Sequence, residues 1–244
     1  MNTDVQRILY ADENGDLEGI FEAQLIDPVP TERANAVRTL LAGEDAVAHF
    51  HAILLLVAWG DHSGLAEAER MLAVDEHPFA GIDTHRLYGV DISYDRLADA
   101  LSLAVTRDRL PIDRVRALAE RLLDLSRTKF FQNGLEQLIS ALNDPTLTDL
   151  TEQAITELAR AGDARKASDL LPALATMDPL RATAAIDLFR DNGSFIERTD
   201  LGVARAFARI HTPESRRELE RFLDNEQFPG ARSVAKRAID RWDM

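Results

Sequence analysis

Five of the six histidines lie within 37 residues, among aspartates that share their potential as metal ligands or proton carriers. The histidines are His49, His51, His62, His77 and His85, and the aspartates are Asp61, Asp75, Asp83 and Asp91. A metal site on a helix needs ligands three or four residues apart, because such positions share one face. His49 and His51 are two apart, so their side chains point about 200° away from each other. His77, Asp83 and His85 would converge only if their loop folded back. We therefore expect capping and surface roles for these residues and no metal site.

The sequence also lacks the other common signatures of catalysis. The chain has 244 residues and no cysteine, which excludes disulfides, thiolate metal sites and a cysteine nucleophile. It contains no glycine-rich phosphate-binding loop and no nucleophile elbow, and Ser63-Gly64 and Gly193-Ser194 fit turns. We expect no cofactor and no enzymatic activity.

Negative charge is concentrated in the first part of the chain. Residues 1–100 hold 19 acidic and 6 basic side chains, whereas residues 101–244 hold 23 and 22, within an overall charge of −14. An acidic surface repels phosphate backbones, whose binding depends on Lys and Arg. It attracts a basic protein and speeds its encounter. This asymmetry predicts a basic protein partner and no nucleic-acid partner, although an acidic surface can also serve solubility alone.

The segment 77–93 is the most distinctive stretch of the acidic region. It contains Phe79, Gly81, Tyr88 and Gly89, and it is far longer than the turns that join most helices. Long loops on rigid scaffolds often bind partners, and tyrosine is a favoured interface residue. The alternative is a degenerate repeat with a helix over residues 83–89. In either case, the predicted partner-binding residues are Asp61, Asp75, Glu76, Asp83, Tyr88, Asp91, Tyr94, Asp95 and Asp99.

Helices are expected to position these residues, because apolar residues recur at helical spacing along almost the whole chain. Proline follows a capping residue at Asp144-Pro145, Asp178-Pro179 and Thr212-Pro213, which is the favoured order at a helix start. Segment 45–59 is apolar on most sides and is expected to be buried. The sequence thus predicts an all-α fold with helices over residues 32–42, 45–59, 64–74, 94–106, 112–127, 133–143, 146–161, 164–176, 180–191, 197–210, 214–224 and 229–242.

A repeat of about 34 residues connects these helices. Pro111, Pro145 and Pro179 are each 34 residues apart, and Gly60-Asp61 precedes Gly162-Asp163 by three such periods. Two helices per unit of this length are typical of an α-solenoid. We therefore predict one helical-repeat domain over residues 1–244, an α-solenoid superhelix of antiparallel helix pairs. Residues 1–106 would form its acidic, degenerate part, with the insertion near 77–93, and residues 107–244 its clearer part.

Two stretches resemble HEAT-like repeats of the phycobilisome-lyase type. In residues 153–174 an alanine-rich helix ends at Gly162-Asp163 and a leucine-bearing helix follows, and residues 204–223 repeat this order around His211-Thr212-Pro213. The resemblance implies a HEAT-like fold, clearest over residues 145–242, and it leaves function open because one repeat scaffold serves many roles. Di-iron enzymes of this family carry repeated His-Glu pairs and its DNA glycosylases a basic channel, and this acidic chain has no His-Glu pair.

No segment of the sequence indicates a membrane protein, and the basic residues near residue 240 do not indicate a nucleic-acid-binding protein. The longest apolar run, residues 52–59, is too short for a membrane span, and residues 1–19 are acidic rather than signal-like. We therefore expect a cytoplasmic protein. The basic residues of the last predicted helix fit the polar outer face of a terminal repeat, and they are Arg232, Lys236, Arg237 and Arg241, followed by Trp242.

The concentrated charge, the interrupted repeat and the missing catalytic signatures favour a bacterial binding protein. Our hypothesis is an immunity protein that neutralises a basic, nuclease-like toxin. A general HEAT-like adaptor is the main alternative, and a HEAT-like lyase or a metal-dependent enzyme is a further one.

Overall fold

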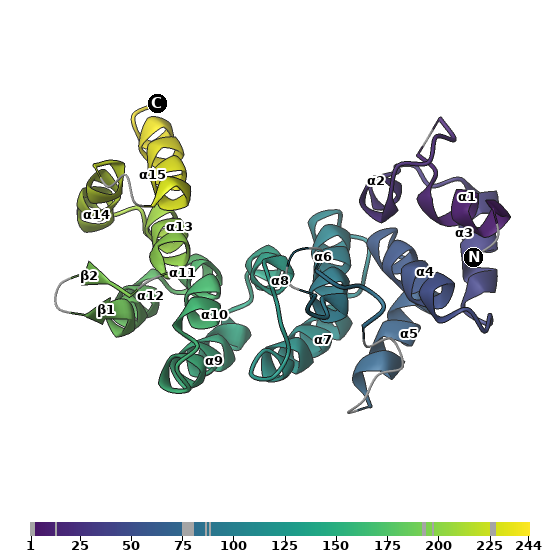
Figure 1. The fold of residues 1–244 in the computed structure, drawn as a ribbon, viewed down its shortest axis with the longest axis horizontal. Coiled ribbons are helices and arrows are strands. Elements are labelled where there is room, and N and C mark those ends of the chain that lie inside the picture. The colour runs from purple at the N-terminus through teal and green to yellow at the C-terminus, as the bar shows by residue number, and fades with distance from the viewer. Residues whose placement is uncertain are drawn as a thin grey trace. The chain divides into compact units, whose positions relative to one another are not determined.

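The chain folds almost entirely into helices (Figure 1). The computed structural model describes residues 3–12, 14–74, 81–85, 87, 89–191, 194–196, 198–224 and 228–244. Within this part, the strands are the two-residue β1 (Arg190–Asp191) and β2 (Ser194–Phe195), which pair antiparallel. The predicted all-α class is therefore confirmed. No helix among these residues is both long and apolar enough to cross a membrane.

The chain divides into two compact units, residues 1–122 and 123–244. In the first unit, the other helices pack around α4 (Ala46–Ala58). Every residue of α4 from Phe50 to Ala58 is buried, because apolar side chains cover most of its circumference, as the sequence predicts. The helices in contact with α4 are α1 (Thr3–Tyr10), α2 (Ile20–Gln24), α3 (Thr31–Leu40), α5 (His62–Leu72) and α6 (Ser93–Thr106). Helix α7 (Ile112–Leu125) follows them in the chain.

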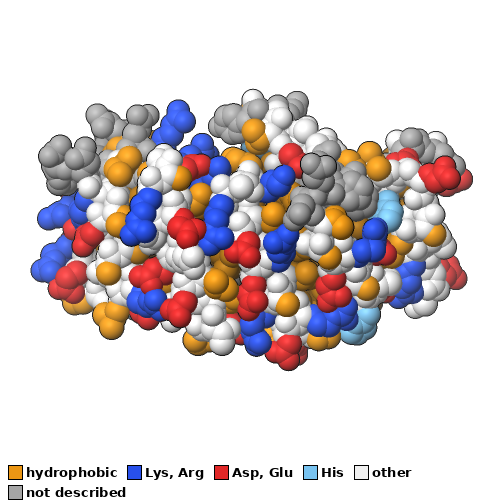
Figure 2. All heavy atoms as spheres, turned by 90° about the horizontal axis from the view of Figure 1, so that it is seen from below, with side chains coloured by type: hydrophobic (Ala, Val, Ile, Leu, Met, Phe, Trp, Pro, Cys, Tyr) orange, Lys and Arg blue, Asp and Glu red, His pale blue; other side chains and the backbone are white. Residues whose placement is uncertain are grey.

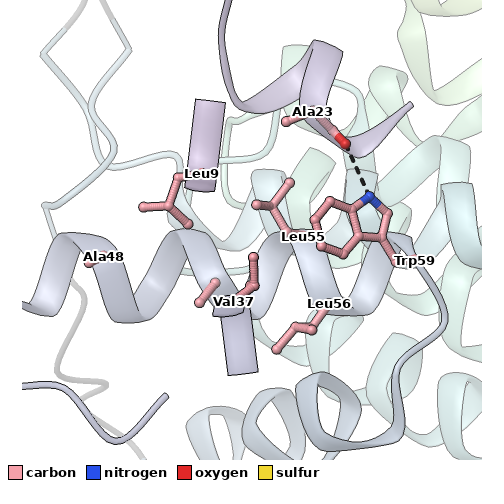
Figure 3. Packing of buried hydrophobic residues seen from close by; sticks show 8 residues of the cluster. Leu9, Ala23, Val37, Ala48, Leu55, Leu56 and Trp59 are labelled. Atoms are coloured by element: carbon pink, nitrogen blue, oxygen red, sulfur yellow. Dashed lines mark hydrogen bonds between the residues drawn. The ribbon is translucent and has the colours of Figure 1, made fainter. Parts of the chain in front are cut away.

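One apolar cluster joins these helices (Figure 3). Leu9 of α1, Val37 of α3 and Leu55 of α4 are fully buried in it. Trp59 ends α4 and is almost fully buried, and its Nε1 donates a hydrogen bond of 3.0 Å to the carbonyl oxygen of Ala23 (Figure 3). The bond satisfies the indole N–H inside the core and fixes α2 against α4.

The turn between α4 and α5 follows the glycine–aspartate signal in the sequence. Gly60 has a φ of +80°, a left-handed conformation that glycine adopts without strain. Asp61 then caps α5, because its carboxylate accepts a hydrogen bond of 2.8 Å from the backbone N–H of Ser63.

The second unit is built from helices that pack around α13 (Asp200–Ile210). Helix α13 contacts α11 (Leu171–Met177), α14 (Pro213–Leu223) and α15 (Pro229–Trp242). Thr212 caps α14, where its hydroxyl accepts a hydrogen bond of 3.1 Å from the backbone N–H of Ser215. The other elements of this unit are α8 (Gly134–Leu142), η1 (Pro145–Leu147), α9 (Thr148–Arg160), α10 (Ala164–Asp169), α12 (Pro179–Ile186) and η2 (Asp187–Phe189), where η denotes a 3₁₀ turn.

The structure corrects the sequence-based helices in several places. Helices α1 and α2 are not predicted, because eight and five residues give too little periodicity. The predicted helix 164–176 is divided at Leu170 into α10 and α11, since Pro172 has no N–H to continue the helix. The predicted helix 180–191 ends at Ile186, and the predicted helix 197–210 begins at Asp200.

The described residues of segment 81–92 form a hairpin-like turn. Thr84 and Asp91 form an antiparallel bridge. The backbone N–H of His85 bonds to the carbonyl of Val90, and that of Ile92 to the carbonyl of Asp83, both at 2.8 Å. The alternative of a helix over residues 83–89 is therefore wrong, because these cross-strand bonds use the backbone groups that a helix needs.

Candidate protein-interaction surface

Most of the excess negative charge belongs to the first unit. Residues 1–122 carry 22 acidic and 11 basic side chains, and residues 123–244 carry 20 and 17. In the second unit arginines pair with acidic neighbours, as Arg181 does with Asp149 and Glu152. Figure 2 shows basic and acidic side chains next to one another on the face that it draws. The uncompensated charge of the first unit is what a cationic molecule meets at long range.

Two of the predicted partner-binding residues use their carboxylates at the start of a helix. Asp91 accepts hydrogen bonds from the backbone N–H of Ser93 at 2.9 Å and from its hydroxyl at 2.7 Å. Asp61 caps α5 and forms an ion pair with Arg38. Burial opposes ionisation of Asp61, but the hydrogen bonds from Arg38 and Ser63 outweigh it and lower the pKa of this carboxyl.

Helix α6 holds three further residues of the predicted set, and two of them are buried. Tyr94 is 3% exposed and Asp95 is 4% exposed, so neither side chain is presented to a partner. This corrects the expectation that they contact one, and the reason is that α6 packs against α4. Asp99 is partly exposed. Burial, with the nearby charge of Asp95, raises the pKa of Asp99 to about 7, against the opposing effect of Arg96.

The remaining residues of the predicted set divide between the described and undescribed parts of the chain. Asp75, Glu76 and Tyr88 lie outside the described residues. Asp83 lies in the hairpin and joins a chain of hydrogen bonds. The hydroxyl of Tyr10 is 2.7 Å from Nδ1 of His51, and Nε2 of His51 is 3.3 Å from a carboxylate oxygen of Asp83. The three residues connect α1, α4 and the hairpin.

The order phenol, imidazole and carboxylate resembles a nucleophile, a base and an orienting acid. Burial, with the charges of Asp83 and Asp45, raises the pKa of Tyr10 to about 12. The phenol therefore stays protonated at neutral pH and donates to Nδ1, which leaves Nε2–H of His51 to donate to Asp83. We assign this chain of hydrogen bonds to positioning of the hairpin, because it links α1 and α4 to Asp83.

The structure reveals an exposed apolar surface on α2 that the sequence analysis missed. Leu17 is 55% exposed, Phe21 is 42% exposed and Leu25 is 58% exposed. Phe21 and Leu25 are four residues apart and share one side of the short helix. Three exposed acidic residues alternate with them in the chain. We call this set the α2 surface, and it consists of Asp16, Leu17, Glu18, Phe21, Glu22 and Leu25.

Side chains from elsewhere in the unit hold α2 in place. Arg107 donates hydrogen bonds to the last carbonyls of the helix, at 3.2 Å to that of Gln24 and 3.1 Å to that of Leu25. The guanidinium carbon of Arg96 lies 4.1 Å from the ring centroid of Phe21, a cation–π contact. Together with the bond from Trp59 to Ala23, these contacts fix a helix that is too short to be stable alone.

This geometry matches what an interface anchor needs. Large apolar side chains on a fixed backbone lose little entropy when they are covered, and acidic residues around them select a cationic partner. The i, i+4 spacing of Phe21 and Leu25 was the available sequence signal. It was hidden because α2 spans only five residues, too few to show a helical period.

The described residues contain no group of three histidine, aspartate or glutamate side chains placed to hold a metal ion. Comparisons of the chain with protein-family models, with curated proteins and with solved structures find no match.

Proposed function

We propose that the chain is a non-catalytic binding protein whose first unit captures a basic protein through the α2 surface. The observation that carries this proposal is the exposure of Leu17, Phe21 and Leu25 on and beside a fixed helix within the acidic unit. Apolar anchors supply affinity when they are desolvated. The surrounding negative charge steers a cationic partner and disfavours acidic proteins and nucleic acids.

The specific function that we propose is that of an immunity protein that neutralises a basic, nuclease-like bacterial toxin in the cytoplasm. A stoichiometric inhibitor needs a rigid complementary surface and no catalytic groups. An enzyme that binds nucleic acid presents a cationic site, which an acidic surface with apolar anchors can cover. Asp83 and Asp91, which belong to the hairpin, would extend the contact beyond the α2 surface.

We further propose that the helices form an α-solenoid with HEAT-like repeats. The contacts of α13 with both α11 and α15 support this arrangement in the second unit, because alternate helices of a solenoid stack on each other. A scaffold of this kind also suits the main alternative function, a general adaptor. The adaptor differs from the immunity protein in that binding does not inhibit an activity of its partner.

A capture experiment with paired variants tests the proposed surface. The chain, a Phe21→Ser/Leu25→Ser variant and a Leu180→Ser/Leu188→Ser control are immobilised and exposed to lysate of the source cells. Leu180 is 83% exposed and Leu188 is 47% exposed in the second unit, so the control removes a comparable pair of exposed apolar side chains. We expect the parent and the control to retain a basic protein from the lysate, and we expect the α2 variant not to retain it.

Growth assays then separate the two functions. Expression of the captured protein alone should arrest growth, and co-expression of the chain should restore it, whereas the α2 variant should not. Capture of the same proteins by all three chains would contradict the proposal. So would a protein that only the α2 variant fails to retain and that is acidic. A captured basic protein that is harmless when expressed alone would favour the adaptor.

A further inference from the structure

A groove in the second unit is lined by positively charged side chains, whereas the α2 surface is acidic. It lies between α13 and α15, which contact each other and are neighbours in Figure 1, and it has a volume of about 250 Å³. Its walls combine four arginines with small apolar residues and one indole. The lining residues are Arg205, Ala208, Arg209, Val234, Arg237, Ala238, Arg241 and Trp242.

The two arginines on α13 share one carboxylate of the same unit. Arg205 contacts the buried carboxylate of Glu136 at 2.5 Å, and Arg209 contacts its other oxygen at 2.8 Å. One carboxylate thus serves two guanidinium groups, and this pair keeps a net positive charge beside the groove. Glu136 itself does not line the groove, so it leaves the cationic wall unobstructed.

The two arginines on α15 have no carboxylate partner among the described residues. Arg237 bonds through Nε to the carbonyl of Ser233 in its own helix, at 3.3 Å, and the guanidinium retains further donors. Arg241 lies one helical turn later on the same side of α15. The sequence suggested a polar outer face for these residues, but both of them line the groove that faces α13.

The apolar part of the groove is defined by Trp242 and small side chains. The indole is backed by His211, with ring centroids 4.5 Å apart. Ala208, Val234 and Ala238 leave room beside it. The site therefore offers two guanidinium forks next to an apolar wall, within a volume that suits one or two side chains.

We propose that this groove binds an acidic peptide segment of a second partner. Arg237 and Arg241 would bind its carboxylates, and Trp242 would contact an adjacent apolar side chain. Guanidinium forks match carboxylates in planar, paired hydrogen bonds. A nucleic-acid strand is a poorer fit, because it carries a charge at every nucleotide and needs a long cationic track.

The test uses a fluorescein-labelled peptide of alternating acidic and leucine residues, eight residues long, with an eight-nucleotide single strand as the competing ligand. Binding is measured by fluorescence anisotropy at physiological ionic strength. The test variant is Arg237→Gln/Arg241→Gln. The control is Arg217→Gln/Arg221→Gln on α14, where the two arginine side chains are 68% and 73% exposed. Each variant therefore removes two positive charges, and only the test variant removes them from the groove.

We expect saturable peptide binding that weakens at least tenfold in the test variant and less than twofold in the control. Equal weakening in both variants would show general attraction by positive charge and would overturn the proposal. An absence of saturable peptide binding, or tighter binding of the oligonucleotide, would overturn it as well. This site uses the second unit alone, so loss of the α2 surface leaves its outcome unchanged.

Discussion

Asp99 on α6 faces a second carboxylate, Asp95, in a partly buried setting, and its pKa is raised to about 7. A carboxyl whose pKa is higher in the folded state than in the unfolded state favours folding in its protonated form. This contribution is complete below a pH of about 4 and is lost as the pH rises through about 7. The ionised Asp99 of the folded protein therefore lowers stability at neutral and alkaline pH.

Replacement of Asp99 by asparagine should remove this cost. Each pKa unit corresponds to about 1.4 kcal/mol, and after allowance for partial exposure we expect Asp99→Asn to raise the free energy of unfolding at pH 8 by about 2 kcal/mol. The gain should shrink towards zero at pH 4. Urea denaturation at both pH values measures it, with Asp113→Asn, an 83% exposed side chain, as the control. Equal effects of Asp99→Asn at both pH values would contradict the prediction.

Glu136 is the second residue with a defined energetic role. Its side chain is 2% exposed and is held by Arg205 and Arg209. Removal of one partner from a buried ionic cluster leaves the others uncompensated, so Glu136→Ala should lower the free energy of unfolding by about 3 kcal/mol. Chemical denaturation measures this loss. The control is Glu214→Ala, which breaks an exposed pair with Arg217 and should change the free energy of unfolding by no more than about 0.5 kcal/mol. Similar losses in both variants would refute the role of burial.

The roles of some single residues could not be predicted from the sequence. Asp91 and Asp95 looked alike in the sequence, yet Asp91 accepts hydrogen bonds from Ser93 and Asp95 is buried. Glu136 gave no signal, because its partners are 69 and 73 residues away in the chain and periodicity reports only local order.

Helices were predictable to the extent that they were long and evenly patterned. Helix α4 was expected to be buried on most sides, and it is. The proline and glycine signals located the starts of α5, α12 and α14 within two residues. Short elements escaped prediction, and α2 with its exposed apolar face is the clearest case, because five residues held by Trp59, Arg96 and Arg107 depend on tertiary contacts.

The packing of α5 on α4 depends on the absence of a side chain at Gly64. A Cβ at this position would lie 2.5 Å from Cβ of Leu56 and 2.9 Å from the backbone nitrogen of Val57. We expect Gly64→Ala to lower the midpoint of thermal unfolding, with a loss of about 2 kcal/mol, because the two helices must separate.

Gly230→Ala is the matched control on α15. A Cβ there meets only a flexible methyl group of Leu201 at 3.6 Å, so alanine should be neutral or stabilising by about 0.5 kcal/mol. Circular dichroism melting curves of the two variants measure the difference. A Gly64→Ala protein as stable as the parent would show that α4 and α5 do not pack as closely as described.

At the scale of the whole molecule, charge and apolar exposure are arranged by unit. The first unit holds 22 acidic against 11 basic side chains and presents the α2 surface, whereas the second is close to balanced and contains the arginine-lined groove. Composition predicted the concentration of negative charge, since charge can be counted along the chain. The groove could not be predicted, because it depends on α13 and α15 lying side by side.

The central claim is that the acidic α2 surface captures a basic partner. Reversal of Asp91, Asp95 and Asp99 would test it poorly, because Asp91 binds Ser93 at the start of α6 and Asp95 is buried. Reversal of the exposed Asp16, Glu18 and Glu22 to lysine changes the charge of the surface itself. A control triple reversal in the second unit uses Asp149, Asp187 and Glu214, which are 85%, 77% and 71% exposed.

The decisive measurement is the association rate of the captured partner, followed by stopped-flow fluorescence at low and high salt. Exposed charges are screened beyond about 8 Å at physiological ionic strength, so we expect the rate for the parent chain to fall at least tenfold between low and high salt. The Asp16→Lys/Glu18→Lys/Glu22→Lys variant should associate at least tenfold more slowly at low salt, and the control reversal should match the parent within twofold. A rate that is independent of salt, or equal slowing by the two triple reversals, would contradict capture by the α2 surface.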